Sequence, residues 1–354
     1  MMLPLPHPLR ALIALSAALT AAFGLTTLAA SEPVSAGLQR VSLDTAANEK
    51  IDVAIWYPTA ILAREQSFGP FTMTVALDAP ILLSAAAEAM PRPLIIISHG
   101  TGGNNFTHHE LASALASAGY IVAALTHPGD NFRDRSLVAS PKYFSERPRQ
   151  ASRVIDALLA DAVWRTRIDT TRIGFLGHSA GGFTGLALAG ATPSIAATVR
   201  HCAANYDDDG WFCRVSGSKE KAIANAAQAD YMPTVPSSRD ARIRAAVLLA
   251  PIGVFFSEAE LKKITIPTRV VVAGRDDVLT PRFHAEFVAR CVANAEVIVN
   301  AEGGHFMLVS RLNINPAASS GAEINQDPKG FDRAAAIRDA AKTLPAWFDK
   351  ALQR

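Results

Sequence analysis

Residues 172–188 read RIGFLGHSAGGFTGLAL, and the turn at their centre decides the interpretation of the chain. Arg172 to Leu176 predicts a strand, and Gly181 to Leu188 predicts a helix. Between them lies the pattern Gly-x-Ser-x-Gly, whose flanking glycines avoid side-chain clashes in a sharp turn around Ser179. The pattern alone is also typical of an ordinary glycine-rich turn, but the strand before it and the helix after it favour a nucleophilic serine.

The loop at Gly274–Pro281 holds two carboxylates that could orient a catalytic histidine. It follows a predicted strand over 269–273 and therefore starts at a strand's carboxyl end. Asp276 and Asp277 compete for this role. The spacing from the glycine and to the proline favours Asp277, and we then expect Asp276 to be a surface or capping residue.

His305 is the candidate general base. It follows Gly303 and Gly304, after a predicted strand over 296–300. The two glycines let the loop return over the sheet edge, where the imidazole could take the Ser179 proton. A single histidine is often packed or solvent-facing, but the chain order serine, aspartate, histidine favours a catalytic role.

A tetrahedral intermediate also needs two backbone N–H donors for its oxyanion. Ala180, directly after the serine, predicts one donor. Residues 98–103 read SHGTGG after a predicted strand over 93–97, and Thr101 is our candidate for the second. The glycines could instead form a phosphate-binding loop, but no Walker lysine follows and the spacing is not GxGxxG.

Short β-branched runs alternate with longer, alanine-rich helical segments along the chain. This alternation predicts an α/β fold with a mostly parallel central sheet flanked by helices on both faces. Two of the expected helices are Pro281–Cys291 and 331–352, the second with an interruption at Pro345.

Two segments break the alternation. Residues 63–89 predict an excursion between early strands. Residues 201–240 are longer and more polar, and they follow the serine-bearing helix. We expect them to form a lid-like insertion above the carboxyl ends of the strands; a solvated surface loop is the alternative.

Residues 1–30 predict a secretory signal peptide rather than part of the fold. Arg10 is the only charged side chain among them, and an apolar stretch runs from Ala11 to Ala30. An uncleaved membrane anchor is the alternative, although alanine, glycine and threonine dilute the segment. We therefore expect one domain over 31–354, located in the periplasm or secreted, with no stable membrane span after cleavage.

The three cysteines are interpreted in that oxidising compartment. Cys202 and Cys213 lie close together in the polar insertion and predict a disulfide. Cys291 lies on a predicted helix, where it is expected to be a small buried apolar residue.

Composition excludes several classes of protein. The 354 residues are 49% hydrophobic and 19% charged, with a formal net charge of +2. Such a chain is neither disordered nor basic enough to suggest a nucleic-acid partner. We expect a small-molecule ester as the substrate; the sequence leaves the oligomeric state open.

The remaining candidates are weaker. His99, His127 and Phe306 lie near the expected site and could line its pocket. His108 and His109 are adjacent in sequence, rather than four apart on one helix face, so we predict no metal site. The chemistry outlined above needs no cofactor.

On these motifs the chain resembles the α/β-hydrolase superfamily. It resembles the branch that contains bacterial predicted dienelactone hydrolases and plasma-type platelet-activating-factor acetylhydrolases. The residues that carry the resemblance are Trp56-Tyr57-Pro58, Ser98-His99-Gly100, Gly177 to Gly182, Gly274 to Pro281 and Gly303 to Phe306, within a span of about Leu38 to Phe348.

The resemblance implies Ser179 as nucleophile, Asp277 as acid and His305 as base, with the Thr101 and Ala180 N–H groups as the oxyanion hole. Dienelactone hydrolases use a cysteine where this chain has Ser179. We therefore expect a serine hydrolase that cleaves carboxylic esters through an acyl-enzyme. The alternatives are lactones, oxidised or short-chain phospholipids or amides as substrates, or a binding protein without turnover.

Overall fold

The computed structural model of the protein describes Met1 and residues 34–45, 49–81, 91–138, 140–215, 217–314 and 322–353. The expected signal peptide over 1–30 lies, apart from Met1, outside the described residues. Pro33–Arg354 is one compact unit. In the described part of the chain, no helix has both the length and the apolar character needed to cross a membrane.

Neighbouring parallel strands form the centre of the sheet, in the spatial order β10-β9-β8-β7-β5-β6. Because they are parallel, their carboxyl ends meet at one edge, where loops from several strands can form one site. The bounds are β5 (Arg92–Ser98), β6 (Ile121–Leu125), β7 (Ile168–His178), β8 (Ile243–Leu249), β9 (Thr268–Ala273) and β10 (Glu296–Asn300).

Four strands from the N-terminal part extend this block, giving ten strands in the described residues. β2 (Lys50–Thr59) pairs antiparallel with β6, and β1 (Ser35–Asp44) pairs antiparallel with β2. The expected excursion over 63–89 contains the hairpin of β3 (Arg64–Phe68) and β4 (Phe71–Leu77), and β4 pairs with β1. Residues 82–89 of that excursion lie outside the described residues.

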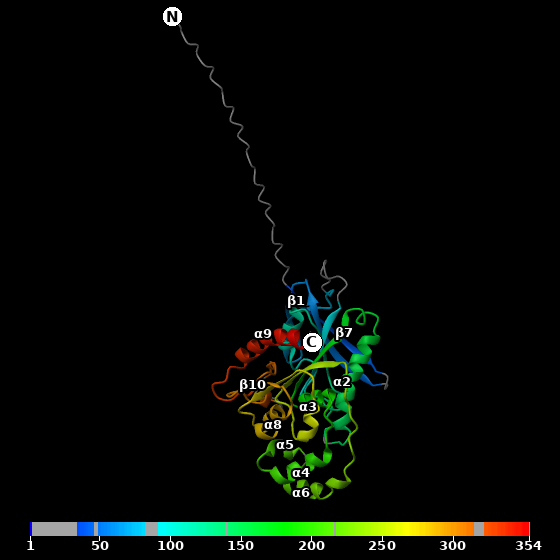
Figure 1. The fold of residues 1–354 in the computed structure, drawn as a ribbon, viewed down its shortest axis with the longest axis vertical. Helices are drawn as coiled ribbons and strands as arrows, with labels where there is room; N and C mark the ends of the chain where they lie inside the picture. Colours follow the sequence, from blue (N-terminus) through cyan, green and yellow to red (C-terminus); the bar gives the residue numbers. More distant parts are fainter. Residues whose placement is uncertain are drawn as a thin grey trace. The chain divides into compact units, whose positions relative to one another are not determined.

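Helices cover both faces of the sheet, as the alternation predicted (Figure 1). Leu94 and Ile96 of β5 pack in one hydrophobic cluster, and Ile95 and Ile97 pack in the other, as the strand's alternating side chains require. The first cluster includes residues of α2 (Tyr143–Ala160), α3 (Ala180–Ala189) and α8 (Ala285–Cys291), and the second includes residues of α1 (His109–Ser117) and α9 (Arg333–Leu352). Further helical segments are α7 (Glu258–Leu261) and η3 (Ala322–Asn325).

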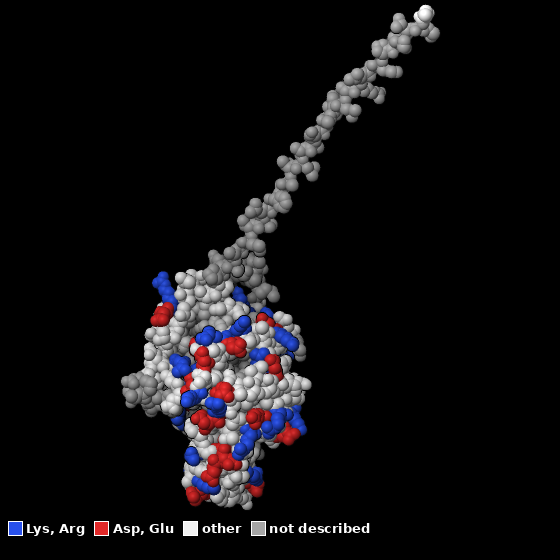
Figure 2. All heavy atoms as spheres, turned by 90° about the vertical axis from the view of Figure 1, so that its left-hand side faces the viewer, with Lys and Arg blue, Asp and Glu red and all other residues white. Residues whose placement is uncertain are grey.

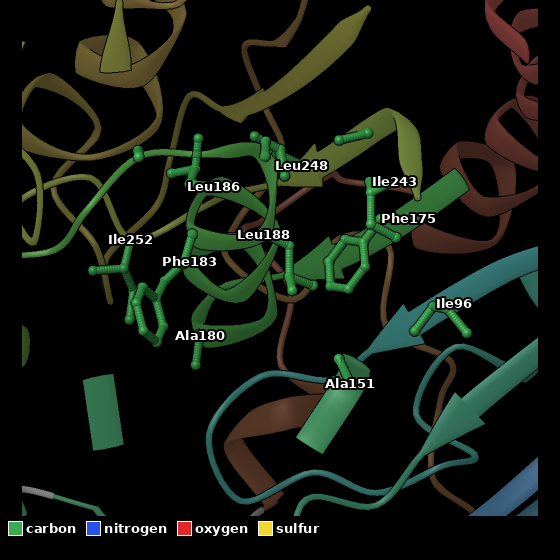
Figure 3. Close-up of a cluster of buried hydrophobic side chains, with 14 of the residues drawn as sticks. Ile96, Ala151, Phe175, Ala180, Phe183, Leu186, Leu188, Ile243, Leu248 and Ile252 are labelled. Atoms are coloured by element: carbon green, nitrogen blue, oxygen red, sulfur yellow. The ribbon is translucent and has the colours of Figure 1, made fainter. Parts of the chain in front are cut away.

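The helix that follows the serine is enclosed on every side. All residues of α3 are buried, which is typical of a helix packed between a sheet and other helices. Figure 3 shows Leu188 of this helix close to Phe175 of β7, Leu186 on the side of Leu248 of β8, and Phe183 close to Ile252. The position of Ser179 is therefore set by a large part of the core.

Two helices differ from the expectation. The predicted helix Pro281–Cys291 is divided into a 3₁₀ helix η2 (Pro281–Phe283) and α8, with non-helical backbone at His284 (φ −118°, ψ −101°). The prediction of one helix was wrong because the His284 side chain makes buried hydrogen bonds that hold the backbone out of the helix. Pro345 lies within α9, which continues through it to Leu352.

The expected insertion between α3 and β8 is mostly helical. It contains α4 (Ile195–Asn205), α5 (Gly210–Arg214), α6 (Lys219–Ala227) and the 3₁₀ helix η1 (Ala229–Tyr231), so its helical part begins before residue 201. Figure 1 shows α4, α5 and α6 grouped below α3 and α8. Cys202 and Cys213 form a disulfide between α4 and α5, with Cα atoms 5.2 Å apart.

The surface charges are mixed in sign. On the face drawn in Figure 2, Lys and Arg side chains lie among Asp and Glu side chains. Lys262 and Glu258 illustrate this, since their exposed side chains form an ion pair. Exposed pairs of this kind contribute little to stability, typically about 0–1 kcal/mol each.

We expect the purified protein to contain one free thiol. Alkylation without reductant should modify at most Cys291, which is free and buried, whereas reduction in denaturant should expose all three cysteines. Closing a loop with a sequence separation of 11 stabilises the fold by about 3 kcal/mol in the chain-entropy model. Intact-mass spectrometry checks this, and three alkylated thiols without reductant would contradict the Cys202–Cys213 bond.

Candidate active site

Ser179 occupies the turn between β7 and α3 in a strained conformation. Its φ of 56° and ψ of −114° are unusual for a residue with a side chain, and its N–H donates to the carbonyl oxygen of Leu249 at 2.9 Å. Strain of this kind persists only where the surrounding structure enforces it, and it is concentrated at functional sites. The turn places the serine at the amino end of α3 and at the carboxyl edge of the sheet.

The glycines of the motif are required by space. A Cβ atom on Gly181 would lie 1.9 Å from the carbonyl oxygen of Ser98, and one on Gly177 would lie 2.1 Å from the carbonyl oxygen of Gly181. These distances are far below van der Waals contact, and the atoms met are backbone atoms that cannot rotate away. Only glycine allows the turn to approach the end of β5 this closely.

His305 and Asp276 form a buried pair at the same edge of the sheet. The His305 Nδ1–H donates to Asp276 Oδ2 at 2.8 Å, and the two side chains are only 2% and 3% exposed. Asp276 Oδ1 accepts the backbone N–H groups of Val278 (3.0 Å) and Leu279 (2.7 Å). The carboxylate is thus held by its own loop while it orients the imidazole.

His305 therefore contacts Asp276, whereas the sequence spacing favoured Asp277 for this position. Asp277 is exposed, whereas Asp276 turns inward to His305 and to the amides of its own loop. The expected spacing ranked two adjacent residues of one loop, but successive side chains leave a backbone in different directions. Which of the two faces the histidine depends on the path of the loop.

His178, inside the serine motif, connects the serine turn to His305. Its Nε2–H donates to the main-chain carbonyl of His305 at 2.9 Å, and the two ring centroids are 4.8 Å apart. His178 was not among the predicted site residues. Burial lowers the pKa of His178 well below its usual value, so its ring is neutral and acts as a hydrogen-bond donor.

The Ser179 hydroxyl itself makes no hydrogen bond to another described residue. Such contacts are often long in substrate-free enzymes and shorten when substrate binds. The His305 ring packs against the ring of Phe306, with centroids 5.0 Å apart, and Phe306 also lies 6.2 Å from the ring of His178. Phe306 is thus the pocket candidate that lies beside the imidazole.

The loop after β5 lies directly against the serine. A Cβ atom on Gly100 would be 3.2 Å from the Ser179 Cβ, and the Gly103 N–H donates to the Gly100 carbonyl at 3.0 Å. Within the described residues, neither the Thr101 N–H nor the Ala180 N–H has a hydrogen-bond acceptor. Both donors are therefore available to a ligand.

A buried ion pair holds this loop in place. Arg147 of α2 and Asp130, both 0% exposed, pair through Nη1 and Oδ2. Asp130 Oδ1 accepts the Gly102 N–H at 2.9 Å, and Arg147 Nη2 donates to the carbonyl oxygen of His99. Arg147 also reaches α3, because its Nε–H donates to Thr184 Oγ1 at 3.3 Å.

Arg147 was not among the predicted site residues, although its sequence context indicates a buried charge. Tyr143, Phe144 and Ala151 lie three or four residues from it on one face of the helix, and all three are buried. An arginine on such an apolar face requires a buried partner, because an unpaired charge there would be very costly.

His99 and His127 belong to the scaffold of the same loop. His99 Nε2 accepts the His127 N–H at 3.0 Å, and His127 bonds both Ser98 Oγ and Gln150 Oε1 at 2.8 Å. Burial, followed by the nearby Arg147 cation, holds the pKa of each imidazole well below its usual value. Both rings are therefore neutral members of a hydrogen-bond network beneath the site.

Two cavities of about 660 and 710 Å³ lie elsewhere in the molecule. Their lining includes Ile243 and Thr268, the first residues of β8 and β9, and Thr170 near the start of β7. These positions are at the amino ends of the strands, whereas Ser179 follows the carboxyl end of β7. Neither cavity is part of the serine site.

Comparison with known proteins agrees with this fold. The model of the alpha/beta hydrolase family matches residues 94–316, more than half of the chain. Among solved structures, a ferulic acid esterase from Streptomyces cinnamoneus is similar, with a TM-score of 0.58 and 19% identity over 92% of each chain. A dienelactone hydrolase-like promiscuous phosphotriesterase from metagenomic libraries has a TM-score of 0.51 and 14% identity, over 90% of this chain and 99% of that one. No curated protein matches the sequence.

We predict that Arg147→Ala lowers the free energy of unfolding by about 3–5 kcal/mol, because it leaves the Asp130 carboxylate buried without its partner. Arg149→Ala is the matched control on the same helix, since Arg149 makes an exposed pair with Glu146. We expect less than about 1 kcal/mol for the control. Equilibrium urea unfolding measures both, and equal effects would refute the structural role of the buried pair.

Proposed function

The chain belongs to the alpha/beta hydrolase family, and from this premise we propose that it is a serine hydrolase that cleaves carboxylic esters through an acyl-enzyme. The observation that carries the proposal is the strained Ser179 turn beside the buried His305–Asp276 pair. A nucleophile, a base and an orienting carboxylate on three loops at one sheet edge are the elements of a catalytic triad.

In the proposed reaction, Ser179 Oγ attacks the ester carbonyl and His305 Nε2 takes the serine proton. Asp276 keeps the imidazole in the tautomer that has its proton on Nδ1, the atom that donates to Oδ2. The same proton then passes from Nε2 to the leaving alcohol, which departs as the acyl-enzyme forms. A water molecule then attacks the acyl-enzyme and gives a proton to His305 Nε2. The proton passes to Ser179 Oγ as the carboxylic acid product leaves.

The free N–H groups of Thr101 and Ala180 are proposed to bind the oxyanion of each tetrahedral intermediate. A single donor of this kind contributes about 3 kcal/mol to the transition state. The Arg147–Asp130 pair would keep Thr101 in place through the adjacent Gly102. A preorganised loop is important because the donors must fit the intermediate rather than the substrate.

An ester substrate is supported by the site chemistry and by one of the structural neighbours, which is described as a ferulic acid esterase. The other neighbour is described as a phosphotriesterase, so a phosphotriester belongs in any substrate panel as the comparison. A lactone, a short-chain phospholipid and an amide complete the panel and separate the other acyl substrates.

We expect the protein to hydrolyse p-nitrophenyl acetate, butyrate or octanoate, and Ser179→Ala to reduce turnover by about a million-fold, to the background rate. A fluorophosphonate probe should label the wild-type protein at Ser179 and leave the variant unlabelled. Full activity of Ser179→Ala would overturn the mechanism. Folded wild-type protein that neither turns over any ester nor takes the probe would instead indicate a binding protein.

The two adjacent aspartates provide a matched test of the acid. Asp276→Asn should lower kcat by about 10⁴-fold, because the amide favours the wrong imidazole tautomer. Asp277→Asn should change kcat by less than about twofold, because Asp277 is exposed and has no contact with His305. Steady-state kinetics on one ester decide the matter, and the reverse ranking would restore Asp277 as the acid.

We also propose that the protein acts outside the cytoplasm, in the periplasm or secreted. Support comes from the pattern of residues 1–30 and from the disulfide, which is typical of exported proteins. In a Gram-negative host expressing the full chain, Edman sequencing of the exported fraction should find a mature N-terminus near Ser31. Full-length protein confined to the cytoplasm would contradict the proposal.

A further inference from the structure

Asp209 connects the helical insertion to the loop that carries the acid. It lies between α4 and α5, and its side chain is 0% exposed. Asp209 Oδ1 accepts the backbone N–H of Thr280 at 3.2 Å, and Oδ2 accepts from His284 Nε2 at 2.7 Å and His201 Nε2 at 2.8 Å. Two of these three donors come from the hydrolase core and one from the insertion itself.

The hydrogen bonds define the charge of this cluster. The Gly253 N–H donates to His284 Nδ1 at 3.2 Å, so the His284 proton is on Nε2, directed at Asp209. Burial lowers the pKa of His284 and keeps the ring neutral. Burial also opposes ionisation of Asp209, but the hydrogen bonds from His201 and His284 outweigh it and hold the pKa of that carboxyl well below its usual range. Asp209 is therefore a carboxylate that accepts hydrogen bonds from both imidazoles.

Two carboxylates accept backbone N–H groups of the Gly274–Pro281 loop, which carries Asp276. Asp276 Oδ1 accepts the N–H groups of Val278 and Leu279, and Asp209 Oδ1 accepts the next N–H, that of Thr280. Three consecutive backbone donors are thus satisfied, two by the acid itself and one by the insertion. Buried backbone donors require such partners, so loss of Asp209 should let the loop move.

The insertion is well placed to hold this contact. Asp208 accepts a hydrogen bond from Thr280 Oγ1 at 2.8 Å and pairs with Arg282 at 2.8 Å. The Cys202–Cys213 disulfide ties α4 to α5 on either side of these aspartates. The two helices therefore present Asp208 and Asp209 to the core as one unit.

A second connection leads from this cluster toward the nucleophile. His284 receives the Gly253 N–H, and the preceding Ile252 N–H donates to the carbonyl oxygen of Ser179 at 3.2 Å. The same insertion carboxylate thus contacts the acid loop directly and reaches the serine turn through His284 and the 252–253 backbone.

The same residues do not form a metal site. His201, Asp209 and Cys213 place potential ligand atoms within 4.8 Å of one another. However, the Cys213 sulfur is bonded to Cys202, and the His201 and His284 Nε2 protons point at the carboxylate. Hydrogen bonds, rather than a shared cation, account for the geometry.

We propose that Asp209 is a positioning residue that fixes the position of the Gly274–Pro281 loop, which carries Asp276. The insertion thereby controls the geometry of the His305–Asp276 pair. The insertion is then a structural part of the catalytic centre and not only a cover over it. This inference rests on the proposed function, because it assigns Asp209 an effect on catalysis through Asp276.

A double-mutant cycle tests the proposal. Asp209→Asn should lower kcat on p-nitrophenyl acetate by about tenfold with KM changed less than about twofold, because it acts on positioning rather than on substrate contact. In the Asp276→Asn background the same substitution should change kcat by less than about twofold, because residues that act as a unit are not additive. The same fold-change in both backgrounds, or unchanged kcat in folded Asp209→Asn, would overturn the proposal.

The control variant is Asp207→Asn, which lies in the same segment but pairs on the surface with Lys219 of the insertion; it should leave kcat unchanged. If Asp209→Asn does not fold, Thr280→Val removes the hydroxyl that donates to Asp208. It should lower kcat about two- to threefold, and only when Asp276 is present. No loss in Thr280→Val would then count against the proposal.

A readout without turnover separates this inference from the proposed function. The His305 Nδ1–H bonded to a buried carboxylate should give a far-downfield proton resonance, assigned by its loss in Asp276→Asn. Asp209→Asn should shift or broaden that resonance, and Asp207→Asn should not. An unmoved resonance would refute the positioning role. A moved resonance in a protein without Ser179-dependent hydrolysis would refute the esterase function and leave the positioning role intact.

Discussion

The strained backbone of Ser179 is the constraint on which the site depends. A positive φ at a residue with a side chain persists only because β7, α3 and the end of β5 converge there. Glycine at 181 lets the turn touch the carbonyl of Ser98, and the enclosed α3 transmits the packing of the core to the nucleophile. Any change that separates these elements would move Ser179 relative to His305.

Buried charged side chains hold two loops of the site in position. Arg147 and Asp130 hold the loop that carries Thr101, and Asp209 holds the loop that carries Asp276. In both cases a buried carboxylate accepts a backbone N–H of the loop. The cost of burying each charge is offset by several hydrogen bonds, and the result is loops with one well-defined position.

Much of this arrangement was predictable from the sequence. The parallel sheet with helices on both faces follows from the alternation of short apolar strands and longer helical runs. The structure places Ser179 in the predicted turn and His305 on the predicted loop, and it joins Cys202 to Cys213. The failures concern side-chain direction and long-range partners: Asp276 takes the place expected for Asp277, and His284 divides an expected helix.

The sequence by itself determined the strand-to-helix turn, the order of the candidate residues and the sheet that brings them to one edge. These are local properties, because periodicity and glycine spacing act within a few residues. The tertiary structure decided which aspartate meets His305, where Arg147 finds its anion and how Asp209 reaches Thr280. These contacts depend on the paths of loops that are far apart in the chain. A small change in the path of the Gly274–Pro281 loop would turn Asp277 instead of Asp276 toward the interior.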